Sequence, residues 1–470
     1  MITSIAAILI GTLVATWLTP AVRRWASMTR LIDDPRRGRS IHNDPIPRVG
    51  GVALAVATLC PIVGLAIWEN TISELMYQDG RMMVTLLVSA LAVLALGLVD
   101  DLVSPPAQTR LAILIGIALF SWLGGHRIEA LDLPILGLVE LGAWSAPTTT
   151  LWIVGVIVAF NFIDGLDGLA TGTALIVTST LFFVALLEGN QLWMTWTGAM
   201  AGALLGFLAF NFNPASVFLG NSGSNFVGYM LAVVALETNR TESTAVAIIV
   251  PMLALGLPIL DAALTMVRRA MLREGMFLGE LGHLHHRLLD MGLSQKRVTF
   301  ALWGVTMLLC LGALTLVAPV APLQMVFGSA ISLVVFWLLL VTGYLRPTDL
   351  QFMWKRGLDN LRRDKALAAL AQRIATQIAL ERNGERVAAV LEQLTQEGAI
   401  SGAEYIRNGQ SPLHVGSYDE QAKGVRTAIR LSGLSSETVT LLWAKRSSGP
   451  SPRELSELTT LLSEANTTKE

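Results

Sequence analysis

The stretch FNFIDGLDGLATG, residues 160–172, places two aspartates in a glycine-rich break between two apolar segments. Asp164 and Asp167 lie three positions apart, whereas the flanking segments 149–160 and 169–187 contain no charged residue. Because ionisable side chains are costly in hydrocarbon, the pattern predicts that the chain leaves the membrane between these segments. The neighbouring glycines would let the backbone approach a ligand closely, or would simply form a turn.

The composition extends this interpretation to the whole chain. Hydrophobic residues make up 53% and charged residues 15% of the sequence, which is typical of a membrane protein with several spans. The net charge of −1 gives no reason to expect nucleic acid as a partner. Both cysteines lie in apolar runs, so no disulfide framework is expected. The first apolar run, 2–19, lacks a preceding basic residue and a small-residue cleavage site, which favours a retained span over a signal peptide.

Apolar windows long enough to cross about 30 Å of hydrocarbon predict an all-α polytopic membrane protein with about eleven transmembrane helices. Two windows, 111–124 and 149–160, are short and must borrow flanking residues or form broken helices that line a cavity. The predicted spans lie near 2–20, 50–68, 82–99, 111–124, 149–160, 169–187, 195–210, 223–237, 245–267, 298–318 and 323–344.

The distribution of lysine and arginine predicts the orientation of these spans. Alternate short loops carry fourteen of these residues on one side, chiefly in 21–49 and 268–297, and three on the other. Since cytoplasmic loops are enriched in Lys and Arg, the rich side is predicted to be cytoplasmic. The amino terminus is then outside and the carboxyl terminus is inside.

A change in composition near Tyr344 predicts three domains. Residues 1–344 form the membrane domain, 345–397 a charged cytoplasmic helical linker, and 398–470 a small cytoplasmic α/β domain. Strand-like runs AEYIRN, GVRTAIRLSG and ETVTLLWAKRS precede a helix that begins at Ser451-Pro452. This tail weakly resembles the end of a GAF-type sensor domain; a small assembly module without a ligand is the alternative.

The loops that carry ionisable residues are all predicted to face the cytoplasm. Asp100 and Asp101 end one span and suggest a metal or a cationic partner, although a water-solvated acid pair fits equally. Together with Asp164 and Asp167, four carboxylates could converge on one divalent ion, and hard oxygen ligands favour Mg²⁺ or Mn²⁺ over zinc. The five loops are 33–51, 97–110, 161–170, 210–229 and 268–292.

The last of these loops holds half of the six histidines, at His283, His285 and His286. A helix would place His283 and His286 on roughly one face. Zinc binding would need further ligands, and no cysteine accompanies them. We expect phosphate or sugar contact, or proton transfer, with a solvated basic face as the alternative. His42 lies in an arginine-rich loop that could hold a diphosphate.

In order and spacing, the five loops resemble the polyprenyl-phosphate N-acetylhexosamine-1-phosphate transferases, and most of all the branch that loads N-acetylglucosamine-1-phosphate onto undecaprenyl phosphate for surface polysaccharides. The resemblance covers about residues 1–340. The motifs that carry it are R-x-x-H-x-x-P-x-P-R-x-G-G at 39–51, G-x-x-D-D at 97–101, N-F-I-D-G-L-D-G-L at 161–169, F-L-G-x-S-G-S at 218–224 and H-L-H-H-R-L-L at 283–289.

The resemblance implies a metal-dependent exchange in which a lipid phosphate attacks the β-phosphorus of a UDP-sugar and expels UMP. The implied substrates are undecaprenyl phosphate and a UDP-N-acetylhexosamine, the cofactor is Mg²⁺ or Mn²⁺, membrane lipid surrounds the protein, and a homodimer is left open. The implied catalytic residues are Asp100, Asp101, His283, His285 and His286. The implied substrate-binding residues are Asp164, Asp167, Arg48, His42, Arg110 and Arg287, and the implied metal ligands are Asn161 and Asn221.

Three positions depart from the family pattern. Val158 stands where the family has an asparagine, and Asn221 stands where it has an acid. Before the histidines the family usually has D-[RK]-x-H, and this chain has Glu280-Leu281-Gly282-His283. Besides an active transferase, a catalytically silent relative that binds lipid or nucleotide and scaffolds through its tail is therefore considered. A transporter is disfavoured because the acids lie at span ends on one side and not at the bilayer midplane.

Overall fold

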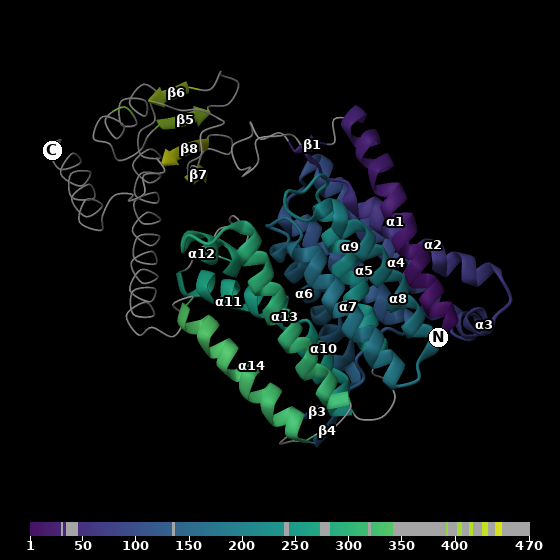
Figure 1. Cartoon of the computed structure of the whole chain (residues 1–470). Helices are drawn as coiled ribbons and strands as arrows, with labels where there is room; N and C mark the ends of the chain where they lie inside the picture. The colour runs from purple at the N-terminus through teal and green to yellow at the C-terminus, as the bar shows by residue number, and fades with distance from the viewer. Residues whose placement is uncertain are drawn as a thin grey trace, which may run out of the picture. The chain divides into compact units, whose positions relative to one another are not determined.

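The structure, a computed structural model, describes residues 1–29, 32–33, 46–133, 137–238, 244–272, 283–317, 321–341, 392, 402–406, 413–416, 425–430 and 438–443. A helical unit occupies most of the first 346 residues, and the chain from Pro347 to Glu470 belongs to a separate unit. The helices and strands of the helical unit are seen in Figure 1. They are α1 (Ile2–Thr29), β1 (Ile32–Asp33), β2 (Ile46–Pro47), α2 (Gly50–Ile67), α3 (Thr71–Gln78), α4 (Gly80–Val103), α5 (Ala107–Gly124), β3 (Ala130–Leu133), β4 (Gly137–Glu140), the 3-10 helix η2 (Gly142–Trp144), α6 (Ser145–Ile163), α7 (Leu169–Leu187), α8 (Gln191–Asn211), α9 (Gly220–Glu237), α10 (Thr244–Ala254), α11 (Gly256–Leu272), α12 (Leu284–Asp290), α13 (Gln295–Val317) and α14 (Ala321–Val341).

The predicted all-α membrane fold is confirmed. Within the described ranges, eight helices are long and apolar enough to cross a membrane: α1, α2, α4, α5, α6, α7, α8 and α13. The predicted total of about eleven spans stays a prediction. The two short windows do borrow flanking residues, because α5 begins at Ala107 and α6 begins at Ser145.

The predicted single span 245–267 is instead two helices, because α10 ends at Ala254 and α11 begins at Gly256. Pro258 has no N–H to donate to the carbonyl of Ala254, which lies four residues earlier, and its ring crowds that carbonyl. The Cys310 thiol of α13 donates to the freed carbonyl at 3.8 Å. The backbone bonds from Leu255 and Ile259 continue on either side of the break.

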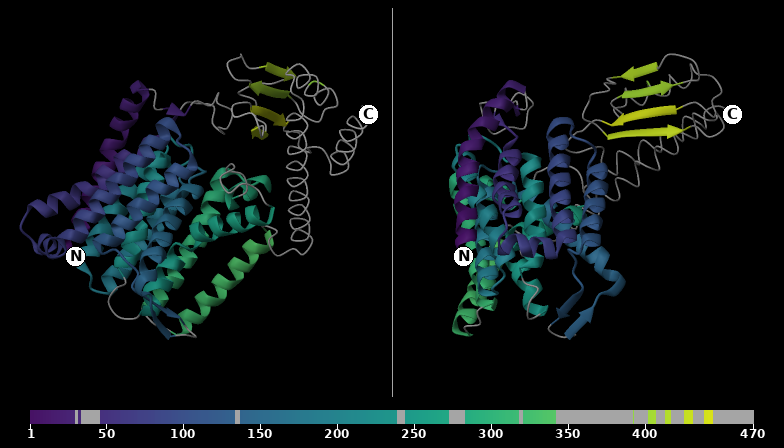
Figure 2. Two further views of the ribbon diagram at one scale, coloured as in Figure 1. Left: turned by 180° about the vertical axis from the view of Figure 1, so that it is seen from behind. Right: turned by 90° about the vertical axis from the view of Figure 1, so that its right-hand side faces the viewer.

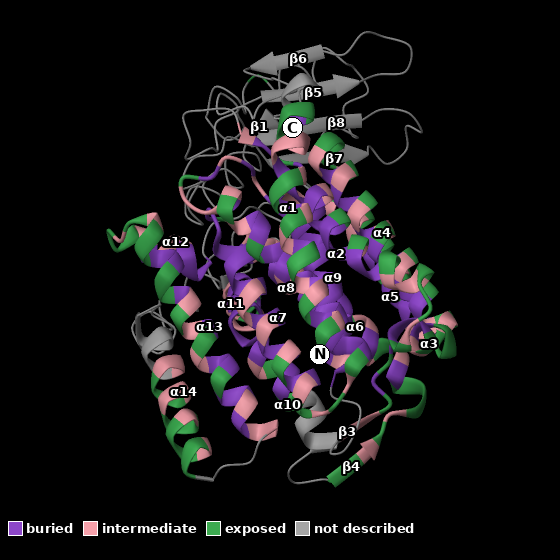
Figure 3. Ribbon diagram, turned by 45° about the vertical axis from the view of Figure 1, so that its right-hand side comes forward, coloured by how far each residue is buried: buried purple, intermediate pink, exposed green. Residues whose placement is uncertain are grey.

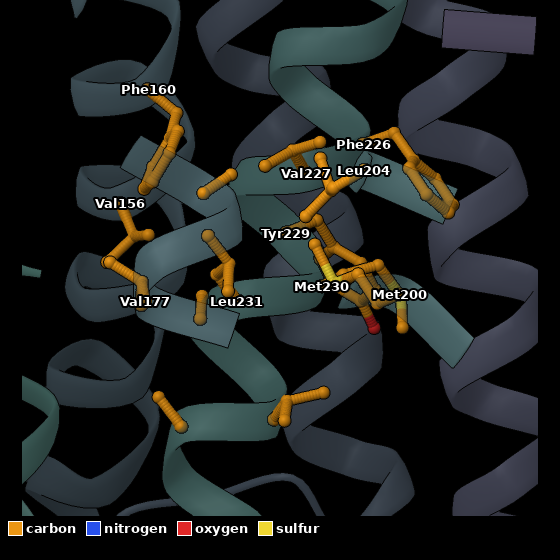
Figure 4. Close-up of a cluster of buried hydrophobic side chains, with 14 of the residues drawn as sticks. Val156, Phe160, Val177, Met200, Leu204, Phe226, Val227, Tyr229, Met230 and Leu231 are labelled. Carbon is orange, nitrogen blue, oxygen red and sulfur yellow. The ribbon is translucent and has the colours of Figure 1, made fainter. Parts of the chain in front are cut away.

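Helix α9 lies at the centre of the helical unit and is buried along almost its whole length. It contacts α2, α4, α6, α7, α8 and α10. Figure 4 shows its side chains, Val227 and Met230 among them, packed with Phe160 of α6 and Met200 of α8. A helix surrounded by other helices is expected to be apolar on all sides, and α9 is mainly apolar from Phe226 to Leu236. By contrast, the side chains of α1 and of the described part of α14 are exposed over much of their surface (Figure 3).

Polar groups fix the carboxyl-terminal end of α9. Glu237 and His126 are both fully buried, and Glu237 Oε1 lies 3.0 Å from His126 Nδ1. The other ring nitrogen of His126 lies 3.1 Å from the carbonyl oxygen of Met82. Buried polar groups are nearly always paired in this way.

Figures 1 and 2 place the β3–β4 hairpin at the end of the helical unit opposite β1.

The tail unit contains a four-stranded antiparallel sheet in the order β6-β5-β8-β7. The three predicted strand runs overlap β5 (Gly402–Ile406), β7 (Val425–Arg430) and β8 (Thr438–Trp443), whereas β6 (Leu413–Gly416) was not predicted. The predicted linker helices of 345–397 and the final helix lie outside the described residues, apart from the isolated helical position Glu392. The three domain boundaries stay predictions.

Three glycines allow α2, α4 and the start of α9 to meet. A Cβ atom added to Gly51 would lie 2.2 Å from the backbone nitrogen of Gly223. One added to Gly97 would lie 2.4 Å from the Cα atom of Ser222. Contacts this short with backbone atoms cannot be relieved by rotating a side chain, so the three helices approach each other only through glycine.

We therefore expect Gly97→Ala to lower the apparent thermal stability of the detergent-purified protein, because overpacking costs about 1–3 kcal/mol. Gly116→Ala is the matched control, since Gly116 lies inside α5 with nothing within 4 Å of an added Cβ atom. That control should be neutral or slightly stabilising. Equal melting temperatures for the two variants would contradict the close packing of α4 on α9.

Candidate functional site

Two of the five predicted loops join through backbone hydrogen bonds at one end of the helical unit. Phe218 donates to the carbonyl of Pro47 at 2.9 Å, and Gly50 and Gly51 donate to the carbonyls of Phe218 and Leu219 at 3.0 Å. Arg48 lies exposed in this junction. The segment before α2 and the segment before α9 are thus held together, as the predicted common side of the membrane requires.

Asp101 connects α4 to the start of α9. Its Oδ1 accepts from the backbone N–H of Asn221 at 2.9 Å, and its Oδ2 accepts from that of Ser222 at 3.0 Å. The first N–H groups of a helix have no partner inside the helix, and the positive end of the helix dipole favours a carboxylate. Asp101 therefore caps α9, a role that its sequence pattern did not predict.

Asp100 has a different partner, although it is adjacent in sequence. Its buried carboxylate lies 2.5 Å from the guanidinium of Arg110, which lies in the first turn of α5 and remains partly exposed. The prediction of a cationic partner for this acid pair is met at Asp100 by an arginine. The two neighbouring acids thus serve separate contacts.

The two candidate metal ligands touch one another. The side-chain amide of Asn161 donates to Oδ1 of Asn221 at 2.8 Å and to the hydroxyl of Ser224 at 3.1 Å. Asn161 lies near the end of α6 and Asn221 in the first turn of α9. This neutral polar contact lies beside the Asp101 cap, because Asn221 takes part in both.

The two acids of the opening stretch have different surroundings. Asp167 is buried, and its Oδ2 accepts from the Asn213 side chain at 2.9 Å and from the Ala215 backbone at 3.0 Å, so it anchors the segment between α8 and α9. Asp164 is partly buried and has no hydrogen bond to any described residue. Burial raises the pKa of Asp164 to about 7; the nearby charges of Asp101 and Asp167 add to this, and Arg48 opposes it.

The four carboxylates do not form a single cluster in the described structure. No three His, Cys, Asp or Glu side chains come together there in an arrangement suited to a metal ion. The donor chemistry nevertheless fits a hard divalent cation, because Asn161 and Asp164 are three residues apart at the end of α6 and supply oxygen atoms. The Asp164 carboxylate, which has no hydrogen bond to any described residue, is the observation that favours a cation at this point.

His283 precedes α12 and contacts an acid that the sequence interpretation missed. Its Nδ1 lies 3.0 Å from Oδ2 of Asp261 on α11, and Asp261 Oδ1 accepts from the backbone N–H of Leu284 at 2.7 Å. Asp261 is the only charged residue in the window 245–267. A lone ionisable residue in an apolar window is itself a signal for a functional contact, and it could have identified Asp261.

His285 brings the histidine segment onto the glycine-rich stretch. A Cβ atom added to Gly165 would lie 2.4 Å from its Nε2, so a side chain at position 165 would have to displace the His285 ring. The ring is buried, and neither nitrogen has a hydrogen-bond partner in the described structure. Burial, with the neighbouring His286, lowers the pKa of His285 to about 3. The ring is therefore neutral at physiological pH and cannot hold a diphosphate by charge.

The remaining predicted residues are distributed along the same end of the helical unit. His286 and Arg287 lie on α12 and are partly exposed, and the ring centroids of His285 and His286 are 4.3 Å apart. The structure thus brings Asp101, Asn161 and Asn221 into one set of contacts, and the histidines into another that touches Gly165. His42 and Glu280 lie outside the described residues. The catalytic and binding roles of all these residues stay predictions.

Comparisons with known proteins show which sequences this chain is similar to. Residues 83–239, which run from α4 to the end of α9, match the model of glycosyl transferase family 4. A Bacillus subtilis protein described as a "probable undecaprenyl-phosphate N-acetylglucosaminyl 1-phosphate transferase" is 31% identical over 317 residues, which are 67% of this chain and 86% of the relative.

Two further relatives carry related names. The decaprenyl-phosphate N-acetylglucosaminephosphotransferase of Mycobacterium tuberculosis is 33% identical, over 63% of this chain and 78% of its own. The phospho-N-acetylmuramoyl-pentapeptide-transferase of Moorella thermoacetica is 30% identical, over 67% of this chain and 99% of its own. With the family model, these relatives show that the chain belongs to the polyprenyl-phosphate N-acetylhexosamine-1-phosphate transferase family, within glycosyl transferase family 4.

Proposed function

We propose that this protein transfers an N-acetylhexosamine 1-phosphate from a UDP-sugar to undecaprenyl phosphate and releases UMP, as the first step in assembling a surface polysaccharide. The names of the relatives support the lipid acceptor and the class of sugar donor. The observation that carries the proposal is the meeting of α4, α6 and α9 through Asp101, Asn221 and Asn161. These groups come from three of the five motif loops.

In the proposed reaction, an oxygen of the lipid phosphate forms a bond to the β-phosphorus of the UDP-sugar. The bond from that phosphorus to the bridging oxygen breaks, and UMP leaves with the electron pair. Such transfers depend mainly on positioning and on neutralising negative charge. Arg48 is exposed beside the site and near the Asp101 and Asp164 charges, and it would attract the phosphates.

Asp164, Asn161 and Asn221 would hold Mg²⁺ in this site, with phosphate oxygens completing its coordination. The ion would supply positive charge to the transferring phosphoryl group. Asp100 and Arg110 neutralise each other, so Arg110 would be held at the site by the buried Asp100. Asp167 would act indirectly, since its contacts hold the segment that leads into α9.

The neutral His285 ring would contact the sugar diphosphate through hydrogen bonds, while the partly exposed Arg287 would supply charge. We further propose that this end of the helical unit faces the cytoplasm and that the protein resides in the inner membrane. The excess of basic residues in its loops supports that orientation.

A catalytically silent relative is the second candidate, and one observation favours it. Both oxygens of Asp101 already accept backbone hydrogen bonds, and the side chain beside it, Asn221, carries no charge. In such a protein the site would bind nucleotide or lipid without turnover. Nucleotide binding that is measurable by calorimetry, with no UMP released from any donor, would establish this alternative.

The first test is release of UMP by the purified protein with undecaprenyl phosphate, Mg²⁺ and a panel of UDP-N-acetylhexosamines. Asp164→Asn should lower kcat/KM by about 10²–10³-fold, the cost of removing one oriented charged group. Glu74→Gln, on the exposed surface of α3, is the control and should retain the parental rate. An Asp164→Asn variant with parental turnover would remove Asp164 from the site.

The pH profile tests the same carboxylate independently. Because the raised pKa leaves Asp164 protonated below about pH 7, the ionised form that binds a cation appears as the pH rises through that value. We expect kcat/KM to rise as the pH increases through about 7. Saturating Mg²⁺ should move the rise to lower pH, since a bound cation favours the carboxylate. A rise that does not move with Mg²⁺ would contradict cation binding at Asp164.

Asn221→Asp tests the metal site by adding a charge at its centre. A carboxylate can still accept from the Asn161 amide, so the fold should be kept, and the extra charge should lower the Mg²⁺ concentration that gives half-maximal activity. Ser224→Ala removes the other partner of Asn161 without changing charge, and its Mg²⁺ dependence should match the parent. Identical titration curves for Asn221→Asp and the parent would remove Asn221 as a ligand.

Cysteine labelling tests the proposed orientation, after the exposed Cys60 is replaced by serine. Ser104→Cys and Ser294→Cys are exposed at the proposed cytoplasmic end and should resist an impermeant thiol reagent added to intact cells. Gln78→Cys, exposed at the end of α3 in a loop proposed to face outward, should react. The reverse pattern would invert the topology.

A further inference from the structure

Asp261 lies on α11 and is buried, yet none of the steps above uses it. Its two oxygens have separate partners, the Leu284 backbone N–H at 2.7 Å and the His283 Nδ1 at 3.0 Å. The hydroxyl of Thr265, one turn further along α11, lies 3.3 Å from the same ring nitrogen. One carboxylate thus holds both the start of α12 and the first histidine.

These contacts determine where His283 carries its proton. An ionised carboxylate only accepts hydrogen bonds, so the nitrogen that faces it must be the protonated one. Nδ1 is therefore the donor, and Nε2 is the nitrogen left for another group. Nε2 has no hydrogen-bond partner in the described structure. A carboxylate that orients a histidine through its second nitrogen is a recurrent device in active sites.

Ring packing ties this histidine to the opening stretch. The Phe162 ring lies 4.9 Å from that of His283, centroid to centroid, and Phe162 is two residues before Asp164. The His285 ring is parallel to the His283 ring within 3°, and the two ring centroids are 5.8 Å apart. Since His285 in turn contacts Gly165, a displacement of His283 would alter the contact between α12 and the turn that carries Asp164.

We propose that Asp261 is a positioning residue for the transfer reaction. It fixes the tautomer and the orientation of His283, and it starts α12, so that His283 Nε2 is available to hydrogen-bond the sugar diphosphate. This inference rests on the proposed function for its substrate, whereas the positioning of His283 and α12 does not depend on turnover.

Asp261→Asn separates the two tasks of the carboxylate. Its amide oxygen can still accept from Leu284, but its amide nitrogen donates to Nδ1, so the proton of the neutral ring moves to Nε2. Asp261→Ala removes both tasks. Asp290→Asn is the matched control, because Asp290 is an exposed acid at the end of α12. Thr265→Val removes only the 3.3 Å contact.

Three measurements on the full-length protein in detergent decide the inference. Ring nitrogen spectra of protein labelled with ¹⁵N-histidine, with His283→Gln to assign the signal, should show the neutral-ring proton on Nδ1 in the parent and on Nε2 in Asp261→Asn. Hydrogen exchange over residues 284–291 should rise in Asp261→Ala and stay near parental in Asp261→Asn. In Asp261→Asn, kcat should fall about 10- to 100-fold with little change in KM.

Each outcome bears on the inference. A ring proton that stays on the same nitrogen in Asp261→Asn, or parental kcat after the proton has moved, overturns it. Asp290→Asn and Thr265→Val should stay within about threefold of the parental kcat, a margin below the loss expected from an orienting carboxylate. If the parent itself releases no UMP, the proposed function fails; unchanged exchange in Asp261→Ala would then separately overturn the positioning of α12.

Discussion

The two hydrogen bonds from the first turn of α9 to the Asp101 carboxylate are the interaction on which the rest of this site depends. Helix α9 is buried among six other helices, so its unpaired N–H groups need partners supplied by protein. Asp101 supplies them from α4. This requires α4 to approach α9 closely, and Gly97 removes the side chain that would prevent it. The Asp101 cap and the close packing at Gly97 therefore depend on each other. Together they hold the start of α9 where Asn221 lies beside Asn161.

Much of this architecture could be predicted from the sequence. Apolar length located the helices, and the charge distribution grouped the motif loops, which the structure joins through Pro47, Phe218 and Gly165. The partners of individual acids could not be predicted in the same way. Asp100 and Asp101 are adjacent and chemically identical, yet one binds a guanidinium and the other a helix terminus. That difference depends on the direction in which each side chain leaves α4, and hydropathy does not report it.

Two misses have specific physical reasons. Pro258 lies in an apolar window that continues on both sides, so the break between α10 and α11 was hidden by uniform hydropathy, although proline chemistry contains the signal. Asp261 lies within the same predicted span, and average hydropathy does not distinguish one acid from the apolar residues around it. Both features concern α11, which begins after the break and whose Asp261 carboxylate contacts His283. The motif at 283–289 therefore contains only one partner of the contact between His283 and Asp261.

The cap at α9 has an evolutionary consequence. Asp101 binds main-chain N–H groups, which every residue except proline possesses, so the position of residue 221 in space is set without reference to its side chain. The frame of the site can thus persist while the chemistry displayed at that position drifts. A change between acid and amide there would alter the charge of the pocket in one mutational step and leave the scaffold intact. Proteins of this fold can in this way gain or lose reactivity without passing through a variant that fails to fold.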